Sequence, residues 1–237
     1  MVDIRNFKGL MYNSNNSGDL SLNICPPFDV ISPSLQSELY NKSQFNLIRL
    51  EYGKEFENDN QNSNKYLRAS NFFNDWVSKN ILEYDESFNF YLTEEKFSFE
   101  NHNYSRTGIT VLVRLEDLNN GSILPHENTR SGPKKDRFSL MKETKCNFSP
   151  LMSLYSDESG EIKNIFKNSK KNKPELSINS DQIKLKLWKI KNLEQIEKIK
   201  KHLINKKLML ADGHHRYETS IYYQDIFSKS KKSDESS

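Results

Sequence analysis

The sequence is poor in cysteine, glycine and proline. Its 237 residues include two cysteines, eight glycines and seven prolines, so a disulfide-stapled miniprotein is excluded. No apolar run approaches the roughly 18–20 residues that a membrane-spanning helix needs. The start, MVDIRNFKGLMY, also lacks the long apolar stretch of a secretory signal. These absences exclude a spanning segment, and we expect a cytoplasmic protein with reduced cysteines.

Lysine and asparagine are abundant instead, with 27 of each against eight arginines. The 35 basic and 32 acidic residues leave a net charge of only +3, which gives no strong field for a polyanion. We therefore expect no nucleic-acid partner. We interpret the abundance of lysine and asparagine as a solvated surface. Residues 1–227 are expected to form one α+β domain or two tightly packed subdomains. The polar end, residues 228–237, is expected to be disordered.

Strand and helix patterns are mixed along the chain, which favours an α+β fold: a mixed sheet with flanking helices. Strands are expected over 21–32 (stopping at the Pro-Pro pair), 45–52, 88–99, 105–116, 150–155, 182–190 and 207–211. Helices are expected over 34–41, 65–80, 138–144, 193–203 and 214–226, and surface loops over 54–64 and 164–174. Ser32 and Pro33 suit the N-cap and first position of the helix at 34–41.

The segment LMLADGHHRYETS, residues 208–220, is the strongest functional motif. A buried strand ends, Asp212 and Gly213 make a tight turn, and a helix begins near His214. Helix starts present free N–H groups and partial positive charge, which suit phosphate, and a glycine lets a ligand approach the backbone closely. Adjacent helical residues point about 100° apart, so one of the two histidines is expected to face the site while the other packs.

The segment ILPHENTRSGPKKDR, residues 123–137, is the second motif. A candidate general acid or base, His126 or Glu127, precedes a Gly-Pro bend rich in cations. Phosphoryl transfer needs charge neutralisation and positioning more than covalent chemistry, and this segment offers both. An exposed polar loop is the plain alternative. The spacing is not that of a P-loop, GxxxxGK[ST].

Two shorter motifs carry weaker signals. In CPPFDVIS, Asp29 lies in a turn made rigid by two prolines. In NLIRLEYG, Arg49 and Glu51 are expected on one face of a strand, where a plain ion pair would contribute little. Cys25 and Cys146 lack a CxxC partner and are expected to be buried or inert. No zinc-ligand, HExxH or GxSxG spacing occurs.

Five segments, PPFDVIS, NLIRLE, ILPHENTRSGPKKDR, NFSPLMSLYSD and LMLADGHHRYETS, follow one another along the chain. In this order they resemble the conserved prokaryotic family catalogued as domain of unknown function 1015. The resemblance covers residues 4–224, with Phe28 in place of the family's usual tyrosine. Family members usually continue into a second half beyond the DGHHR helix. The resemblance therefore implies that this chain corresponds to the N-terminal portion of a longer architecture.

The strand–DGHHR–helix unit is also similar to a wider superfamily of ParB-type partitioning proteins, sulfiredoxins and free serine kinases. In that superfamily the corresponding turn and helix start bind nucleotide or substrate phosphate. Sulfiredoxins have a catalytic cysteine in this turn, and the histidine found here disfavours sulfinic-acid reduction. The similarity to free serine kinases implies phosphoryl transfer to a small hydroxyl substrate.

The sequence thus predicts a kinase-type phosphotransferase for free L-serine that uses Mg²⁺ and a nucleotide or pyrophosphate donor. One alternative is a ParB-like nucleotide-binding module associated with nucleic acid and without phosphotransfer; another is a catalytically inactive fragment. The expected catalytic residues are Glu127, His126, Glu51 and His215; the expected substrate or phosphate ligands are Asp29, Arg49, Arg130, Lys134, Arg137, Gly213, His214 and Arg216; and Asp212 is the expected metal ligand.

Overall fold

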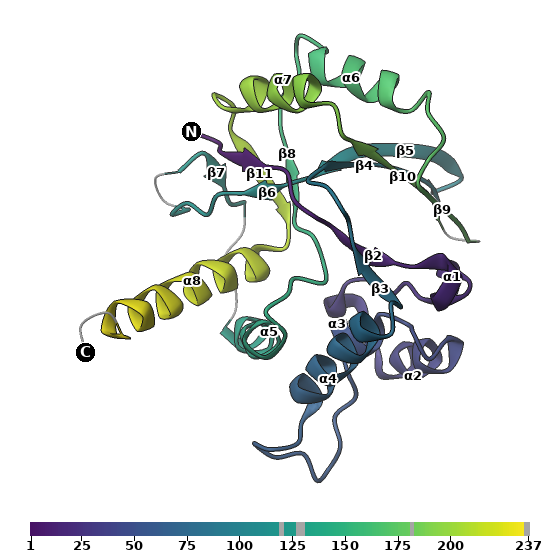
Figure 1. Cartoon of the computed structure of the whole chain (residues 1–237), viewed down its shortest axis with the longest axis vertical. Helices are drawn as coiled ribbons and strands as arrows, with labels where there is room; N and C mark the ends of the chain where they lie inside the picture. Colours follow the sequence, from purple (N-terminus) through teal and green to yellow (C-terminus); the bar gives the residue numbers. More distant parts are fainter. Residues whose placement is uncertain (119–120, 127–130, 181–182, 235–237) are drawn as a thin grey trace. The chain divides into compact units, whose positions relative to one another are not determined.

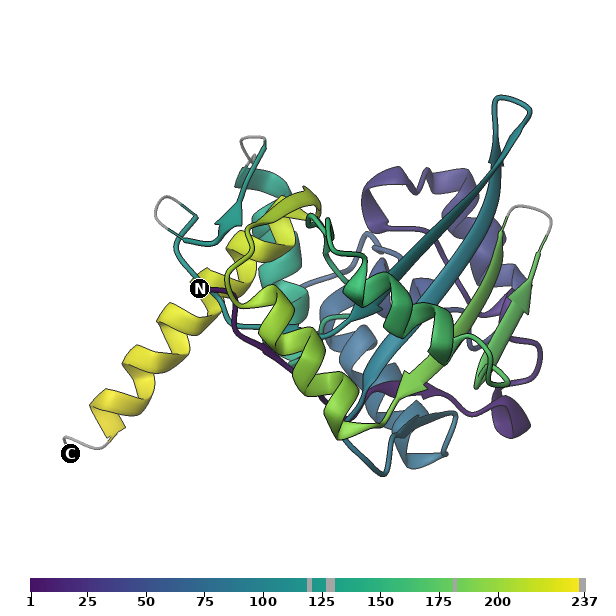
Figure 2. The ribbon, with the colours of Figure 1, turned by 90° about the horizontal axis from the view of Figure 1, so that it is seen from above.

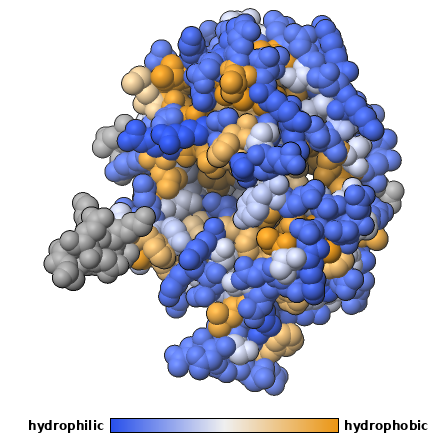
Figure 3. Space-filling model, viewed as in Figure 1, coloured by the Kyte–Doolittle hydropathy of each residue, from blue (hydrophilic) through white to orange (hydrophobic). Residues whose placement is uncertain are grey.

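The chain divides into two compact units, each assembled from three separate segments. The structure, a computed structural model, describes residues 1–118, 121–126, 131–180 and 183–234. Unit 1 comprises Met1–Tyr12, Glu83–Arg114 and Tyr155–Leu208, and unit 2 comprises Asn13–Leu82, Leu115–Leu154 and Met209–Ser237. Hydrophilic residues dominate the face drawn in Figure 3, in keeping with the abundance of lysine and asparagine.

Unit 1 is built on an antiparallel sheet of order β5-β4-β10-β9, with two helices against one face (Figures 1 and 2). Its strands are β4 (Phe90–Phe99), β5 (His102–Thr110), β9 (Leu176–Asn179) and β10 (Lys184–Ile190), and its helices are α6 (Glu161–Ser169) and α7 (Leu193–Leu203). Leu92 and Ile190 of the sheet and Ile162 and Ile199 of the helices are fully buried. Short ladders join β1 (Ile4–Arg5) to β6 (Leu112–Val113) and β2 (Leu10–Tyr12) to β3 (Leu82–Tyr84).

Unit 2 is mainly helical and carries a small sheet of order β7-β11-β8. Its strands are β7 (Ile123–Leu124), β8 (Met152–Leu154) and β11 (Leu208–Asp212). Its helices are α1 (Ser14–Ser17), α2 (Pro33–Lys42), α3 (Ile48–Glu51), α4 (Lys65–Ser78), α5 (Ser131–Thr144) and α8 (His214–Asp234), with 3₁₀ turns η1 (Leu20–Leu22) and η2 (Phe28–Val30). Helix α5 packs against both α4 and α8. Buried apolar side chains from α3, α4 and α5, among them Ile48, Trp76 and Leu140, form its core.

The mixed α and β composition predicted from the sequence is confirmed. Helix α7 has the predicted bounds, and α4 ends two residues before the predicted end. Ser32 is the N-cap of α2, because its hydroxyl accepts a hydrogen bond from the backbone N–H of Leu35 at 3.2 Å, and Pro33 occupies the first position. None of the helices in the described part of the chain combines the length and apolarity needed to cross a membrane.

The strand predicted at 45–52 is wrong, because its centre is helix α3. The cause is Asn46, which is fully buried. Its amide donates to the carbonyls of Leu22 and Ile24, and its side-chain oxygen accepts from the N–H of Ile48 at 3.0 Å. An asparagine that bonds the backbone two residues ahead starts a turn rather than a ladder.

Three further expectations also differ from the structure. Residues 21–32 form 3₁₀ turns instead of a strand, since Pro26 and Pro27 have no N–H to donate to a ladder. Residues 164–169 continue α6, where Ile162, Ile165 and Phe166 bury one helical face despite the lysines and asparagines between them. Helix α8 runs on to Asp234, through most of the stretch expected to be disordered.

The Ser32 cap gives a direct test of this part of the fold. Replacing Ser32 with alanine removes the acceptor for the Leu35 N–H and should lower the free energy of unfolding by about 1 kcal/mol. Urea denaturation would measure the change. Ser37→Ala, an exposed interior position of the same helix, is the matched control and should leave stability unchanged or slightly raised. Equal effects of the two variants would contradict the cap.

Candidate functional site

Motifs that are distant in the sequence meet in unit 2. Arg137 bonds to Glu51, 86 residues away, and the backbone of His126 bonds to His214, 88 residues away. Arg216 donates to the carbonyl of Pro150, 66 residues away. These bonds join four of the motifs, and the ring of Phe28 against Arg137 adds the fifth. Glu127 and Arg130 lie outside the described residues.

The start of helix α8 follows directly from a glycine with a left-handed backbone. Gly213 has φ +89° between the end of β11 and His214. A Cβ atom there would lie 2.6 Å from Cδ2 of Leu151 and 3.1 Å from Nη2 of Arg216. Glycine is thus required both for the turn and for the close packing around it. The predicted strand–turn–helix is confirmed, but neighbouring side chains of the protein fill the space beside Gly213.

Two histidine rings meet edge to face at this point, and their hydrogen bonds define which ring nitrogens carry protons. The rings of His126 and His214 are 4.5 Å apart at 78°. The backbone N–H of His126 donates to Nε2 of His214 at 3.3 Å, so that nitrogen is unprotonated. Nδ1 of His126 lies 2.6 Å from the carbonyl oxygen of Leu210, which can only accept, so Nδ1 carries the proton. His214 is buried, His126 is exposed, and His215 is half-buried.

The guanidinium of Arg216 closes the turn from inside the protein. The Arg216 residue is 8% exposed, and its guanidinium donates to the carbonyl of Pro150 at 2.8 Å and to Oδ2 of Asp212 at 2.7 Å. Asp212 therefore accepts a charged hydrogen bond from the helix that it precedes. Among the described residues, no group of three or more histidine, cysteine or acidic side chains is placed to hold a metal ion.

Arg137 and Glu51 form a buried ion pair at the centre of the motifs. Their side chains are 6% and 3% exposed. Nη1 of Arg137 donates to the Glu51 carbonyl at 2.9 Å and to its carboxylate at 3.2 Å, while Nε donates to Asp136 at 2.8 Å. The guanidinium carbon also lies 4.0 Å from the centre of the Phe28 ring. Arg137 thus joins α3, α5 and η2.

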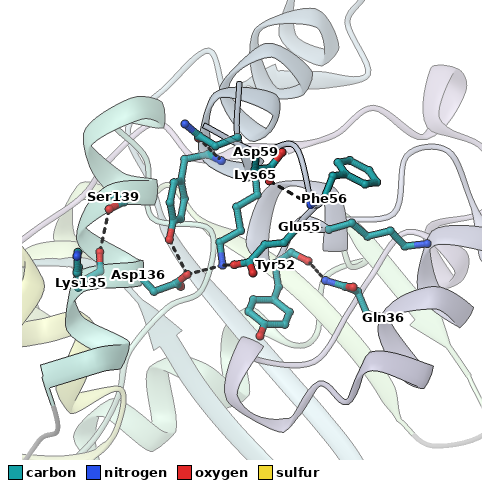
Figure 4. A network of polar contacts seen from close by, with 12 residues as sticks. Gln36, Tyr52, Glu55, Phe56, Asp59, Lys65, Lys135, Asp136 and Ser139 are labelled. Carbon is teal, nitrogen blue, oxygen red and sulfur yellow. Dashed lines mark hydrogen bonds and ion pairs between the residues drawn. The ribbon is translucent and has the colours of Figure 1, made fainter. Parts of the chain in front are cut away.

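The network continues through Asp136 to a lysine that the sequence analysis did not single out (Figure 4). The Lys65 ammonium lies 2.7 Å from Asp136 and 2.7 Å from Glu55, and the Tyr66 hydroxyl donates to Asp136 at 2.9 Å. Burial disfavours the charge of Asp136, but the charge of Arg137 and the hydrogen bond from Lys65 outweigh it, so the Asp136 pKa is lowered. The signal available in the sequence was a lysine at the first position of an amphipathic helix.

The remaining predicted residues have varied positions. The expectation that Arg49 and Glu51 share one face of a strand is wrong, because both lie in helix α3. Arg49 donates instead to the carbonyls of Ser43 and Tyr40. Asp29 is exposed in η2. Lys134 forms an ion pair with Glu218, which ties the start of α5 to α8.

Burial and the charge of Glu51 both raise the pKa values of the two cysteine thiols. Burial raises the pKa of Cys25 to about 12 and that of Cys146 to about 11, with a smaller contribution from the Glu51 charge. Both side chains therefore stay protonated thiols at neutral pH, which is the poorly reactive form. Cys146 also lines a small cavity of about 20 Å³ beside Glu51, Arg137 and Arg216.

Removing Arg137 should strongly destabilise unit 2. Arg137→Met leaves Glu51 buried without its partner, and we expect a loss of roughly 3–5 kcal/mol in the free energy of unfolding. Glu55→Gln is the control, because Glu55 is 71% exposed at the outer end of the same network and should cost less than about 1 kcal/mol. Chemical denaturation of both variants measures the difference. A change below 1 kcal/mol for Arg137→Met would contradict the role given to this pair.

Asp136 predicts a pH dependence with a definite sign. Because its folded-state pKa is lowered, its contribution to stability is present above about pH 4 and is lost as the pH falls through the folded-state value. The Asp136→Asn variant should be less stable than the parent at pH 7, and the difference should shrink at about pH 3. Denaturation at both pH values tests this, with exposed Asp29→Asn as control. A difference independent of pH would refute it.

Comparison with known proteins agrees with the order of motifs. The family model described as "Protein of unknown function (DUF1015)" matches residues 4–237, nearly the whole chain. The chain matches no curated protein and no solved structure. Because the family model covers nearly the whole chain, including the motifs that meet around Arg137 and at the start of α8, the chain belongs to the DUF1015 family.

Proposed function

We propose that this chain is a phosphotransferase that acts on a small hydroxyl substrate, with free L-serine as the acceptor and a nucleotide or pyrophosphate as the donor. The observation that carries the proposal is the meeting of His126 and His214 at the start of α8. The finer similarity of β11, Gly213 and α8 to the ParB and sulfiredoxin superfamily is part of the same proposal. The proposal also includes a cytoplasmic location, because nucleotide and pyrophosphate donors are found there.

Two helix starts supply the affinity for phosphate. Helix α8 begins at His214 and α5 at Ser131, and the Lys134–Glu218 ion pair holds these helices together near their first turns. The N–H groups of a first helical turn have no acceptor within the helix, and the helix dipole adds partial positive charge. Both features favour a phosphate group.

The histidine pair supplies a proton acceptor. With its proton on Nδ1, neutral His126 has Nε2 unprotonated, and the ring is exposed. A histidine in this state can accept the proton of an attacking hydroxyl group. We assign this role to His126 or to its neighbour Glu127. Glu51 is buried and bonded to Arg137, so in this proposal both residues position the site rather than touch substrate.

Mg²⁺ in such a reaction is held by one or two carboxylates together with substrate phosphates and water. Asp212 fits this requirement as a single carboxylate, because its side chain is 49% exposed at the start of α8. Its hydrogen bond from Arg216 fixes the carboxylate orientation. Bound Mg²⁺ would neutralise charge on the donor phosphates.

A direct assay tests the proposal. The purified chain, and in parallel a second family member, would be incubated with serine, Mg²⁺ and ATP, ADP or pyrophosphate, and phosphoserine measured by mass spectrometry. His126→Gln should lower kcat by about 100-fold or more, as expected for loss of a general base. His102→Gln, an exposed histidine of β5, should leave it unchanged.

The outcomes separate the alternatives. Phosphoserine formation that depends on His126 supports the phosphotransferase. Failure of both proteins to make phosphoserine with any donor would overturn it, and nucleotide binding without turnover would favour the ParB-like module instead.

A further inference from the structure

The small net charge of the chain hides an uneven division between the units. Unit 1 contains 19 basic and 14 acidic residues, whereas unit 2 contains 16 basic and 18 acidic residues. Unit 1 therefore has a net charge of +5 and unit 2 of −2. Unit 1 is therefore the part of the chain in which we expect a surface that attracts anions.

The pairing of the four-stranded sheet gathers lysines on one face. Lys184 of β10 lies directly opposite Lys96 of β4, and the next pair on the same face is Lys186 opposite Glu94. Successive residues of a strand alternate between faces, so these four side chains point to the same side. Lys96, Lys184 and Lys186 are exposed.

A fourth lysine reaches this face from the end of α6. The ammonium of Lys170, which follows α6, lies 2.7 Å from the Glu94 carboxylate and 3.3 Å from the hydroxyl of Thr107. Lys96 is 3.8 Å from the same carboxylate. The single glutamate is thus shared among several lysines, and the group of four lysines with Glu94 keeps a net charge of +3. We call this group the lysine face.

The Lys96–Lys184 pair costs stability. Like charges directly opposite each other on adjacent strands are destabilising, while opposite charges stabilise. The same sheet satisfies this rule elsewhere, for example in the Glu95–Arg106 pair. A pair of exposed lysines that joins the first residue of β10 to the interior of β4 is therefore not explained by folding, and it is the arrangement expected of a surface whose charge is completed by a bound anion.

The neighbours of the lysine face favour nucleic acid over a membrane surface. Across the sheet, Lys184 and Lys96 are flanked by Asn179 and Ser105, and Lys186 and Glu94 by Ser177 and Thr107. Membrane surfaces are bound by basic residues together with apolar side chains that enter the lipid, and these two rows contain none. Lysine, serine, threonine and asparagine are the side chains that contact phosphate and sugar in nucleic-acid complexes.

We propose that the lysine face of unit 1 binds the phosphate backbone of a nucleic-acid duplex without reading its sequence. This inference goes beyond the proposed phosphotransferase and does not rest on it. Backbone contacts of this kind carry affinity but no sequence information, and they weaken steeply as salt displaces the protein.

The test compares two variants with the same change of charge. In the face variant, Lys96, Lys184 and Lys186 are replaced by glutamine. In the control, glutamine replaces three lysines of α7 in the same unit, Lys198, Lys200 and Lys201. Two of these control lysines are already paired, Lys198 with Glu194 and Lys200 with Glu197. Fluorescence anisotropy with labelled DNA and RNA duplexes of mixed sequence, from about 50 to 200 mM salt, gives affinity and salt slope.

The face variant should bind at least tenfold more weakly at about 50 mM salt and lose up to about 2.7 units of the log–log salt slope, since each phosphate contact contributes about 0.9. The control should match the parent chain. Because the substitutions relieve like-charge repulsion, the face variant should also unfold at the same or higher temperature. The single variant Lys184→Gln provides a milder second test of binding.

Three results would overturn the proposal. The first is no binding of either duplex by the parent chain at about 50 mM salt. The second is an equal loss of affinity in the face and control variants. The third is binding to phosphatidylserine vesicles alone, which would assign the lysine face to a membrane surface.

Discussion

Unit 2 depends on the guanidinium of Arg137. Burying a charge is costly unless it is paired and its hydrogen-bonding groups are satisfied, and Arg137 meets both conditions with Glu51, Asp136 and the ring of Phe28. These partners come from α3, α5 and η2, three segments far apart along the chain. The segments that carry Arg137 and Glu51 must fold together, because either charge would be left buried and unpaired without the other.

The same constraint locates the candidate site. With α5 fixed through Arg137, the Lys134–Glu218 ion pair places α8 beside it, and Gly213 sets where α8 begins. His126 then contacts His214 from the strand side. In the proposed function the reacting groups are the histidines and the two helix starts, and the buried arginines Arg137 and Arg216 hold these elements in place.

The sequence could predict elements with a local cause and could not predict elements with a distant one. The cap at Ser32 and the turn at Gly213 depend on neighbouring residues, and both predictions are confirmed. Helix α3 depends on Asn46 finding carbonyls more than twenty residues earlier, so alternation of apolar residues there suggested a strand. Lys65 was missed for the same reason: its carboxylate Asp136 lies 71 residues along the chain.

Charge shows this limit most clearly. In unit 2, three of the basic residues of the motifs have protein partners: Arg49 bonds to carbonyls, Arg216 to a carbonyl and Asp212, and Lys134 to Glu218. Their clustering in the sequence suggested anion binding, yet their partners are protein groups. In unit 1 the lysines of β4 and β10 are separated in the sequence, and only strand pairing brings them opposite each other. Positive charge that is conspicuous in the sequence thus stabilises the fold, whereas charge scattered along it forms the exposed basic surface.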